Sequence, residues 1–195
     1  ENLTIQGNYY DVVRWGGGEI LNDRTWRRAG APGAVPYRID GDVVVTTTVT
    51  LTIESGVEVQ LGYSDDLYVY GGLLAVGTAT QPITFTHYSS GSSDWGGIYV
   101  APRARARFDY VTIEYGGYST LDETLWIASD DVQVSHSTLR YNYSRAKVVY
   151  ISDGASPVIT STVITDNGLK GRYSSGSGIK IVGGGARQRC RTCRS

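Results

Sequence analysis

The sequence contains no methionine, and its two cysteines, Cys190 and Cys193, both lie near the C-terminal end. Without a methionine the chain cannot be a complete translated reading frame, so we expect that an N-terminal piece was removed, and a cleaved export signal fits that role. Because the body of the chain has no cysteine, it cannot depend on disulfides or thiolate metal sites. The Cys-x-x-Cys pair lacks a second ligand pair, so we expect no metal there.

The sequence also lacks a large surplus of positive or negative charge, and it lacks long apolar runs. The chain has 18 Lys and Arg residues against 19 Asp and Glu residues, a formal net charge of −1. Binding to nucleic acid through phosphate contacts normally requires a basic surplus, so nucleic acid is not an expected partner. No stretch approaches the roughly 18 apolar residues of a membrane-spanning helix, so we expect no insertion into a membrane. A length of 195 residues corresponds to one domain, or at most two.

The residues that are abundant favour β-structure interrupted by turns. The chain has 25 Gly and 15 Tyr but only 2 Phe residues. Short runs alternate apolar and polar residues, as in Val43 to Val45 and Leu51 to Ile53, and each run is followed by Gly, Asn, Asp or Ser. Such alternation with a period of two predicts short β-strands.

These strands recur with a period of about 25 residues. The apolar pair Val134 and Leu139 is repeated by Ile159 and Ile164, at the same offset of 25 residues. Three short strands per period cannot enclose a core alone, but coils stacked on one another can. The sequence therefore predicts a solenoid.

Three segments carry a resemblance to a known architecture: residues 50–60, 73–86 and 94–100, with the sequences TLTIESGVEVQ, LLAVGTATQPITFT and DWGGIYV. They resemble the right-handed parallel β-helix of secreted bacterial proteins, a group that includes polysaccharide lyases, pectin-type hydrolases and adhesins. The resemblance covers about residues 37–183 and implies an all-β protein of about five to six coils outside the cell. Residues 1–36 do not repeat, and we expect them to form an N-terminal cap. Residues 184–195 lose the pattern, and we expect a disordered tail.

The strand that opens each coil places one residue between two inward apolar side chains, as Tyr68 lies between Leu67 and Val69. The intervening residue must point outward, and its equivalents stack about 4.8 Å apart from coil to coil. The residues of this aromatic column are Tyr68, Tyr99, Trp126, Tyr150 and Lys180.

Contiguous exposed aromatic surface usually marks a contact site. Tyr and Trp rings suit the apolar faces of sugars, so the predicted ligand of the column is a linear polysaccharide lying along the helix axis. Two other interpretations stay open: the rings only stabilise the sheet, as cross-strand aromatic pairs do, or a neighbouring domain packs on them.

Acidic residues occupy the turns on both sides of the column. The candidate catalytic residues are Asp94, Asp122, Glu123, Asp130 and Asp153, and Lys147 follows in the coil after Glu123. Carboxylates one coil apart would approach the roughly 5 to 5.5 Å separation of retaining glycosidases, and their mutual repulsion would raise one pKa to supply a general acid. The same oxygens could instead bind Ca²⁺, or the Asp residues serve only their turns.

Smaller features have structural explanations. We predict an ion pair between Glu114 and Arg140 on adjacent coils and an amide ladder between Asn142 and Asn167. The residues Arg103, Arg105 and Arg107 alternate with Ala104, Ala106 and Phe108, so we expect a basic stripe on one strand. We expect His87 and His136 to be structural.

Three functions are compatible with these observations. The first is an extracellular polysaccharide-binding module, present as a monomer or as part of a larger surface protein. The second is a glycan-degrading enzyme, a hydrolase or lyase, with the acidic turns as catalysts. The third is a structural or adhesin segment. The pectin-hydrolase pattern is matched in part, by Asp130-Asp131 and Lys180, but its Gly-His-Gly and Arg-x-Lys elements are missing.

Overall fold

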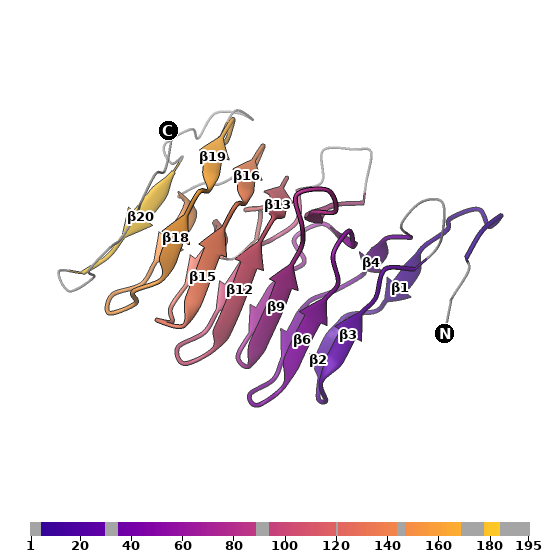
Figure 1. Cartoon of the computed structure of the whole chain (residues 1–195), viewed down its shortest axis with the longest axis horizontal. Coiled ribbons are helices and arrows are strands. Elements are labelled where there is room, and N and C mark those ends of the chain that lie inside the picture. The colour runs from indigo at the N-terminus through magenta and orange to yellow at the C-terminus, as the bar shows by residue number, and fades with distance from the viewer. Residues whose placement is uncertain are drawn as a thin grey trace.

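The computed structural model describes residues 5–29, 35–88, 94–119, 121–143, 147–168 and 178–183. These residues form twenty β-strands arranged in three parallel sheets (Figure 1), and no helix occurs among them. No segment of this part of the chain is therefore a helix that could cross a membrane.

Each coil passes through the three sheets in turn, so every sheet collects one strand from nearly every coil. In spatial order, sheet A consists of β1 (Val13–Trp15), β4 (Tyr37–Ile39), β7 (Glu58–Leu61), β10 (Ile83–His87), β13 (Val111–Glu114), β16 (Thr138–Arg140) and β19 (Val163–Thr165). Sheet B consists of β2 (Gly18–Ile20), β5 (Val43–Val45), β8 (Leu67–Val69), β11 (Ile98–Val100), β14 (Glu123–Ile127), β17 (Lys147–Ile151) and β20 (Ile179–Ile181). Sheet C consists of β3 (Arg24–Trp26), β6 (Thr50–Ile53), β9 (Gly72–Val76), β12 (Arg105–Asp109), β15 (Val132–Ser135) and β18 (Val158–Thr160).

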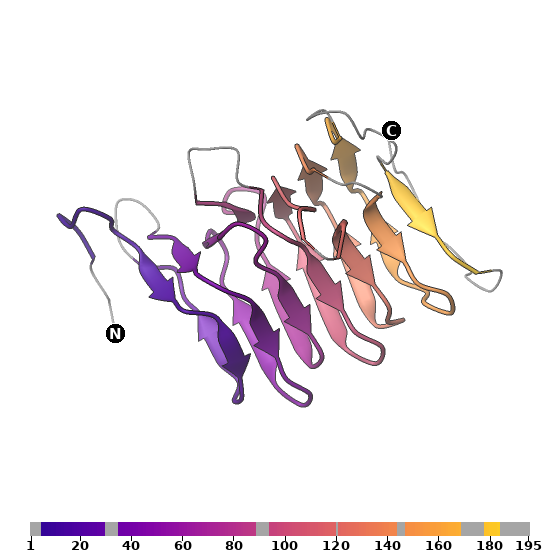
Figure 2. The ribbon, with the colours of Figure 1, turned by 180° about the vertical axis from the view of Figure 1, so that it is seen from behind.

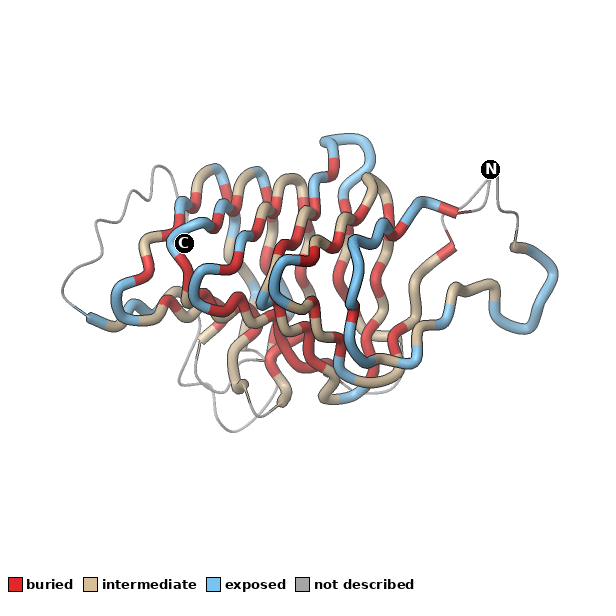
Figure 3. Tube along the Cα trace, turned by 90° about the horizontal axis from the view of Figure 1, so that it is seen from below, coloured by how far each residue is buried: buried red, intermediate tan, exposed pale blue. Residues whose placement is uncertain are grey.

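The all-β parallel β-helix predicted from the repeat is confirmed, with about six coils. Seen from behind, the coils again follow one another in sequence order along the long axis (Figure 2). Buried and exposed residues alternate along the trace of the coils (Figure 3). The inward residues form columns of aliphatic side chains, and the two Phe residues, Phe85 and Phe108, are buried among them. The core is thus continuous along the stack, which is how short strands share one hydrophobic interior.

The prediction that residues 1–36 form a non-repeating cap was wrong for residues 13–26. Strands β1, β2 and β3 pair in parallel with β4, β5 and β6, so this segment is itself a coil. The aliphatic pattern is absent here because Trp26 supplies the inward surface: it is 2% exposed, and its ring stacks on Tyr37 at a centroid distance of 5.2 Å. The predicted tail, residues 184–195, lies outside the described residues.

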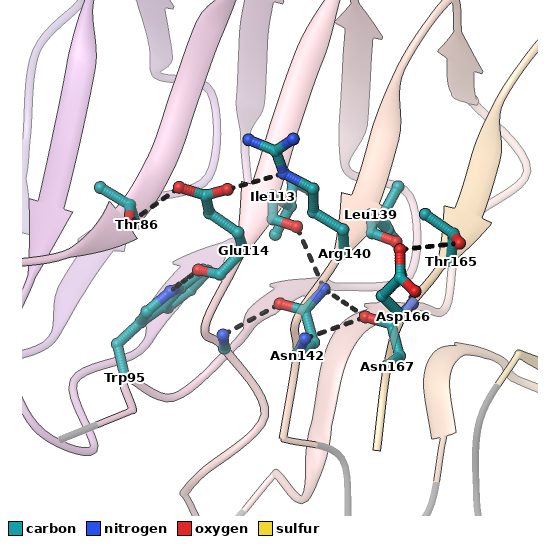
Figure 4. A network of polar contacts seen from close by, with 11 residues as sticks. Thr86, Trp95, Ile113, Glu114, Leu139, Arg140, Asn142, Thr165, Asp166 and Asn167 are labelled. Carbon is teal, nitrogen blue, oxygen red and sulfur yellow. Dashed lines mark hydrogen bonds and ion pairs between the residues drawn. The ribbon is translucent and has the colours of Figure 1, made fainter. Parts of the chain in front are cut away.

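Side chains at one corner of the coils bind backbone groups of the next coil (Figure 4). Asn142 donates from Nδ2 to Asn167 Oδ1 at 3.0 Å, and its own Oδ1 accepts from the Gly116 amide at 2.9 Å. Nearby, Arg140 Nε lies 2.9 Å from Glu114 Oε2. The predicted amide ladder and cross-coil ion pair are therefore both confirmed.

The turn between β5 and β6 contains a strained residue, Thr48, whose φ is 71°. A β-branched residue is disfavoured in this left-handed region, which glycine adopts without steric strain because it has no Cβ. We expect Thr48→Gly to raise the free energy of unfolding by about 1 kcal/mol, as measured by urea denaturation. The matched control Thr47→Gly, in the same turn, should instead lower it by about 0.5 kcal/mol. Equal effects of the two changes would contradict this explanation.

Candidate functional site

The strand register brings the aromatic column together on the outer face of sheet B. Tyr68 pairs with Tyr99, Tyr99 with Trp126, Trp126 with Tyr150, and Tyr150 with Lys180. The four aromatic residues are half-buried and Lys180 is exposed. This arrangement follows from the period of two within each strand, because both flanking residues face the core.

The rings of the column contact one another edge to face. The centroid distances are 6.4 Å for Tyr68 and Tyr99, 5.1 Å for Tyr99 and Trp126, and 5.4 Å for Trp126 and Tyr150. The ammonium of Lys180 lies 5.5 Å from the ring centroid of Tyr150. Edge-to-face pairs are attractive beyond simple burial, so each ring helps to fix the next.

Two polar groups of the column are already engaged by the protein. Trp126 Nε1 donates to Ser152 Oγ at 2.7 Å, and the Tyr68 hydroxyl donates to Asp66 Oδ2 at 3.1 Å. These two hydrogen bonds hold the rings in place, which reduces the entropy that a ligand would have to remove on binding.

The column runs beside a wall made by the loops between sheets A and B. Thr124 lies two residues before Trp126 and points to the same face, yet it is fully buried because the loop at Gly116 packs against its methyl group. The same loops carry a second aromatic row, with centroid distances of 5.2 Å between Tyr63 and Tyr118 and 5.3 Å between Tyr118 and Tyr143. Sequence reasoning missed this row because the loops differ in length and have no common register.

The acidic residues of the turns before sheet B have different environments. Asp94 and Asp66 are 5% and 2% exposed. Asp66 Oδ1 accepts hydrogen bonds from the Gly97 amide at 2.7 Å and from Ser119 Oγ at 2.8 Å, so it ties three segments together. Burial raises the pKa of Asp66. These two carboxyl groups are enclosed by the loop wall and are poorly placed to meet a polymer on the column.

Two acidic residues of the turn after β14, Asp130 and Asp131, bind a backbone amide and two arginines. Asp130 Oδ1 accepts a hydrogen bond from the Ser156 amide at 2.8 Å, while Asp153 is exposed at its turn. Asp131 binds both Arg107 and Arg105, and these hydrogen bonds hold its pKa below the usual value.

The positive charge of the predicted basic stripe is therefore partly neutralised by an acidic partner. Arg105 and Arg107 are neutralised in part by the single carboxylate of Asp131, which lies one coil further on. Arg103 is not on the strand at all: it lies in the preceding turn, is exposed, and has a φ of 69°. The sequence alternation predicted the inward alanines correctly, since Ala104 and Ala106 are buried, but it did not predict the cross-coil partner.

Glu123 differs from the other acidic candidates. It begins strand β14, three residues before Trp126, and pairs in register with Lys147. Its pKa is raised from 4.5 to about 7, first by burial and then by the neighbouring charge of Asp122, while Lys180 and Lys147 act in the opposite direction. A carboxyl group with a pKa near neutrality is able to give and take a proton under ordinary conditions.

The calcium alternative gains no support from the geometry. Within the described ranges, no group of three or more His, Cys, Asp or Glu side chains is arranged to hold a metal ion. The two histidines instead contact aromatic rings: His136 stacks on Tyr110 at 4.8 Å and His87 on Tyr115 at 4.5 Å.

Comparison with known proteins agrees with the architecture. Residues 31–127, just under half of the chain, match the family model described as a pectate-lyase like beta helix domain. A stretch of 89 residues, 46% of this chain, is 39% identical to "Protein bark beetle" of Drosophila melanogaster and covers 3% of that protein's length. No solved structure gives a significant match. The chain is thus a parallel β-helix protein, and its similarity to a pectate-lyase-like domain fits a polysaccharide-related role.

Proposed function

We propose that the protein is an extracellular polysaccharide-binding module whose ligand lies along the aromatic column. The observation that carries this proposal is the in-register column itself, in which four aromatic side chains are aligned on successive strands and remain partly exposed. A chain of sugar rings can bury its apolar faces on such a platform, and the preformed rings reduce the entropic cost of binding. The similarity of residues 31–127 to a pectate-lyase like domain supports a carbohydrate ligand.

Replacing Trp126 by alanine tests this function. We expect Trp126→Ala to weaken polysaccharide binding by about tenfold or more, because it removes the ring at the centre of the platform. Binding is measured by isothermal titration against a panel of plant, algal and bacterial polysaccharides. The matched control is Tyr141→Ala, an exposed aromatic residue at a different corner of the coil, which should leave the affinity unchanged. If wild type and Trp126→Ala bind equally well, the column is not the binding surface.

A second candidate function, cleavage of the bound glycan, is favoured by one observation. The pKa of Glu123 is raised to about 7, and Lys180, the last residue of the column, is close enough to influence it. In this alternative Glu123 is the general acid that protonates the leaving sugar oxygen, and Asp122 supplies a second carboxylate. Release of reducing ends or unsaturated products from a bound polysaccharide is the assay.

A further inference from the structure

A hollow lies at the corner between sheets B and C, at one end of the aromatic column. The turn from β8 to β9 has only two residues, Tyr70 and Gly71, whereas its neighbours on both sides, residues 46–49 and 101–104, have four. The short turn therefore projects less far from the coil than the turns on either side of it, and it forms the floor of a hollow of about 510 Å³. We call this hollow the corner notch. Its walls include Thr47, Thr48, Pro102, Arg103 and Arg105, together with the carboxylate of Asp131, which is paired with Arg105.

Glycine makes the short turn of the notch possible. A Cβ added to Gly71 would lie 2.2 Å from the carbonyl oxygen of Val49 and 2.3 Å from that of Thr46. The backbones of adjacent coils also meet here, since the Gly72 amide donates to Val49 O at 2.8 Å and the Arg105 amide to Gly71 O at 2.9 Å. The notch is thus a fixed feature of the stacked coils, so a ligand would find it already formed.

An aromatic side chain joins the notch to the column. Tyr70 lines the notch, is 44% exposed, and its ring centroid lies 6.2 Å from that of Tyr99. A sugar stacked at Tyr99 would therefore have its neighbouring groups within reach of Tyr70 and the notch. The notch is a continuation of the proposed binding surface and rests on that proposed function.

The charges around the notch do not balance. Arg105 and Arg107 share the single carboxylate of Asp131, so one positive charge is in excess there. Arg103 has no acidic partner among the ion pairs of the described residues. Asp130, in the same turn as Asp131, accepts a hydrogen bond from the Ser156 amide of the following coil and keeps its negative charge, so the three arginines exceed the two carboxylates by one positive charge. Guanidinium groups bind oxyanions through paired, charge-assisted hydrogen bonds.

We propose that the corner notch is a subsite for an anionic substituent, a sulfate ester or a carboxylate, carried by a sugar that stacks on Tyr70. The Arg103 guanidinium binds the oxyanion, and the hydroxyl groups of Thr47 and Thr48 donate to its remaining oxygens. The subsite makes the column selective for charged over neutral glycans.

The first experiment tests the notch apart from the column. Glucose 6-sulfate, glucuronate and glucose are titrated at equal ionic strength into the wild-type protein and into Arg103→Gln, and the backbone amide signals of Thr47, Thr48 and Arg103 are followed by NMR. We expect saturable shifts with a charged sugar and none with glucose, and about tenfold weaker binding to Arg103→Gln. Saturation by one charged sugar alone identifies the oxyanion. The absence of shifts with both would overturn the subsite without affecting the column.

The second experiment compares polymers that differ only in their substituent: dextran, dextran sulfate and carboxymethyl dextran. Arg103→Gln should reduce the preference for the charged polymers about tenfold, while Arg27→Gln, which removes an exposed arginine outside the notch, should not. An equal loss in both variants would mean attraction by general charge and would reject the subsite. Trp126→Ala should weaken binding of all three polymers and keep their ratio, so failure of the column is distinguishable from failure of the notch.

Discussion

Replacement of Asn142 by alanine is expected to lower the free energy of unfolding by about 3 kcal/mol. The side chain is 1% exposed and makes three hydrogen bonds: its Nδ2 donates to Ile113 O and to Asn167 Oδ1, and its Oδ1 accepts from the Gly116 amide. Alanine would leave two buried backbone groups of the preceding coil, the Ile113 carbonyl and the Gly116 amide, without these partners, and each such group costs about 1 to 3 kcal/mol. Urea denaturation followed by circular dichroism gives the difference.

A matched control comes from the next rung of the same ladder. Asn167 is half-buried, so water can reach the groups that its removal would expose. We expect Asn167→Ala to lower the free energy of unfolding by only about 1 kcal/mol. Losses of equal size for the two variants would contradict the view that burial, and not the number of hydrogen bonds, determines the cost.

The coil architecture and the aromatic column were predictable because both follow from short-range patterns. Alternation within a strand determines which residues face the core, and the repeat of about 25 residues then aligns Tyr99 with Trp126 and Trp126 with Tyr150. The first coil was missed for the complementary reason: Trp26 fills its interior with one large side chain, so the aliphatic alternation disappears while the strand pairing remains.

The environment of each acidic residue was not predictable, because it depends on loops without a common length. Asp66 and Glu123 both precede or begin strands of sheet B, and in the sequence they look alike. In the structure Asp66 is enclosed and hydrogen-bonded by Ser119, whereas Glu123 faces the charges of Lys147 and Lys180. A sequence pattern gives the strand on which a carboxylate lies, but burial by a neighbouring loop decides its pKa.

The column and the loop wall have different roles: the column positions the aromatic rings, and the loops supply the polar groups beside them. Strands of sheet B fix the spacing of the rings, and the hydrogen bonds of Trp126 and Tyr68 to Ser152 and Asp66 fix their orientation. The loops differ from coil to coil and supply the groups that vary, such as the buried Asp66 and Asp94. A solenoid can therefore keep its aromatic column while the polar residues of the neighbouring loops change, because substitutions in a loop do not disturb the register of the strands.

If the protein cleaves the glycan that it binds, Glu123→Gln should reduce turnover by about 10² to 10⁴-fold while polysaccharide affinity stays close to that of wild type. A general acid must be protonated to act, so wild-type activity should fall as the pH rises through about 7, the pKa of Glu123. The charged groups that influence this carboxyl are Asp122, Lys180 and Lys147. Lys147→Gln is the matched control: it removes a positive charge that lowers the pKa of Glu123, so this pKa should rise and the fall in activity should shift to higher pH. Full turnover by Glu123→Gln would exclude this residue as the acid.

The same substitution has a consequence for stability that does not depend on any activity. The pKa of Glu123 is higher in the folded chain, about 7, than its usual value of 4.5, so the folded state binds this proton more tightly than the unfolded state. The free energy of unfolding should therefore be greatest below pH 4.5, decrease as the pH rises to about 7, and then level off with respect to this group. After allowance for screening by solvent the decrease is about 1 kcal/mol. Glu123→Gln should lack it, and an unchanged pH profile of unfolding would mean that Glu123 titrates normally and is not poised to act as an acid at neutral pH.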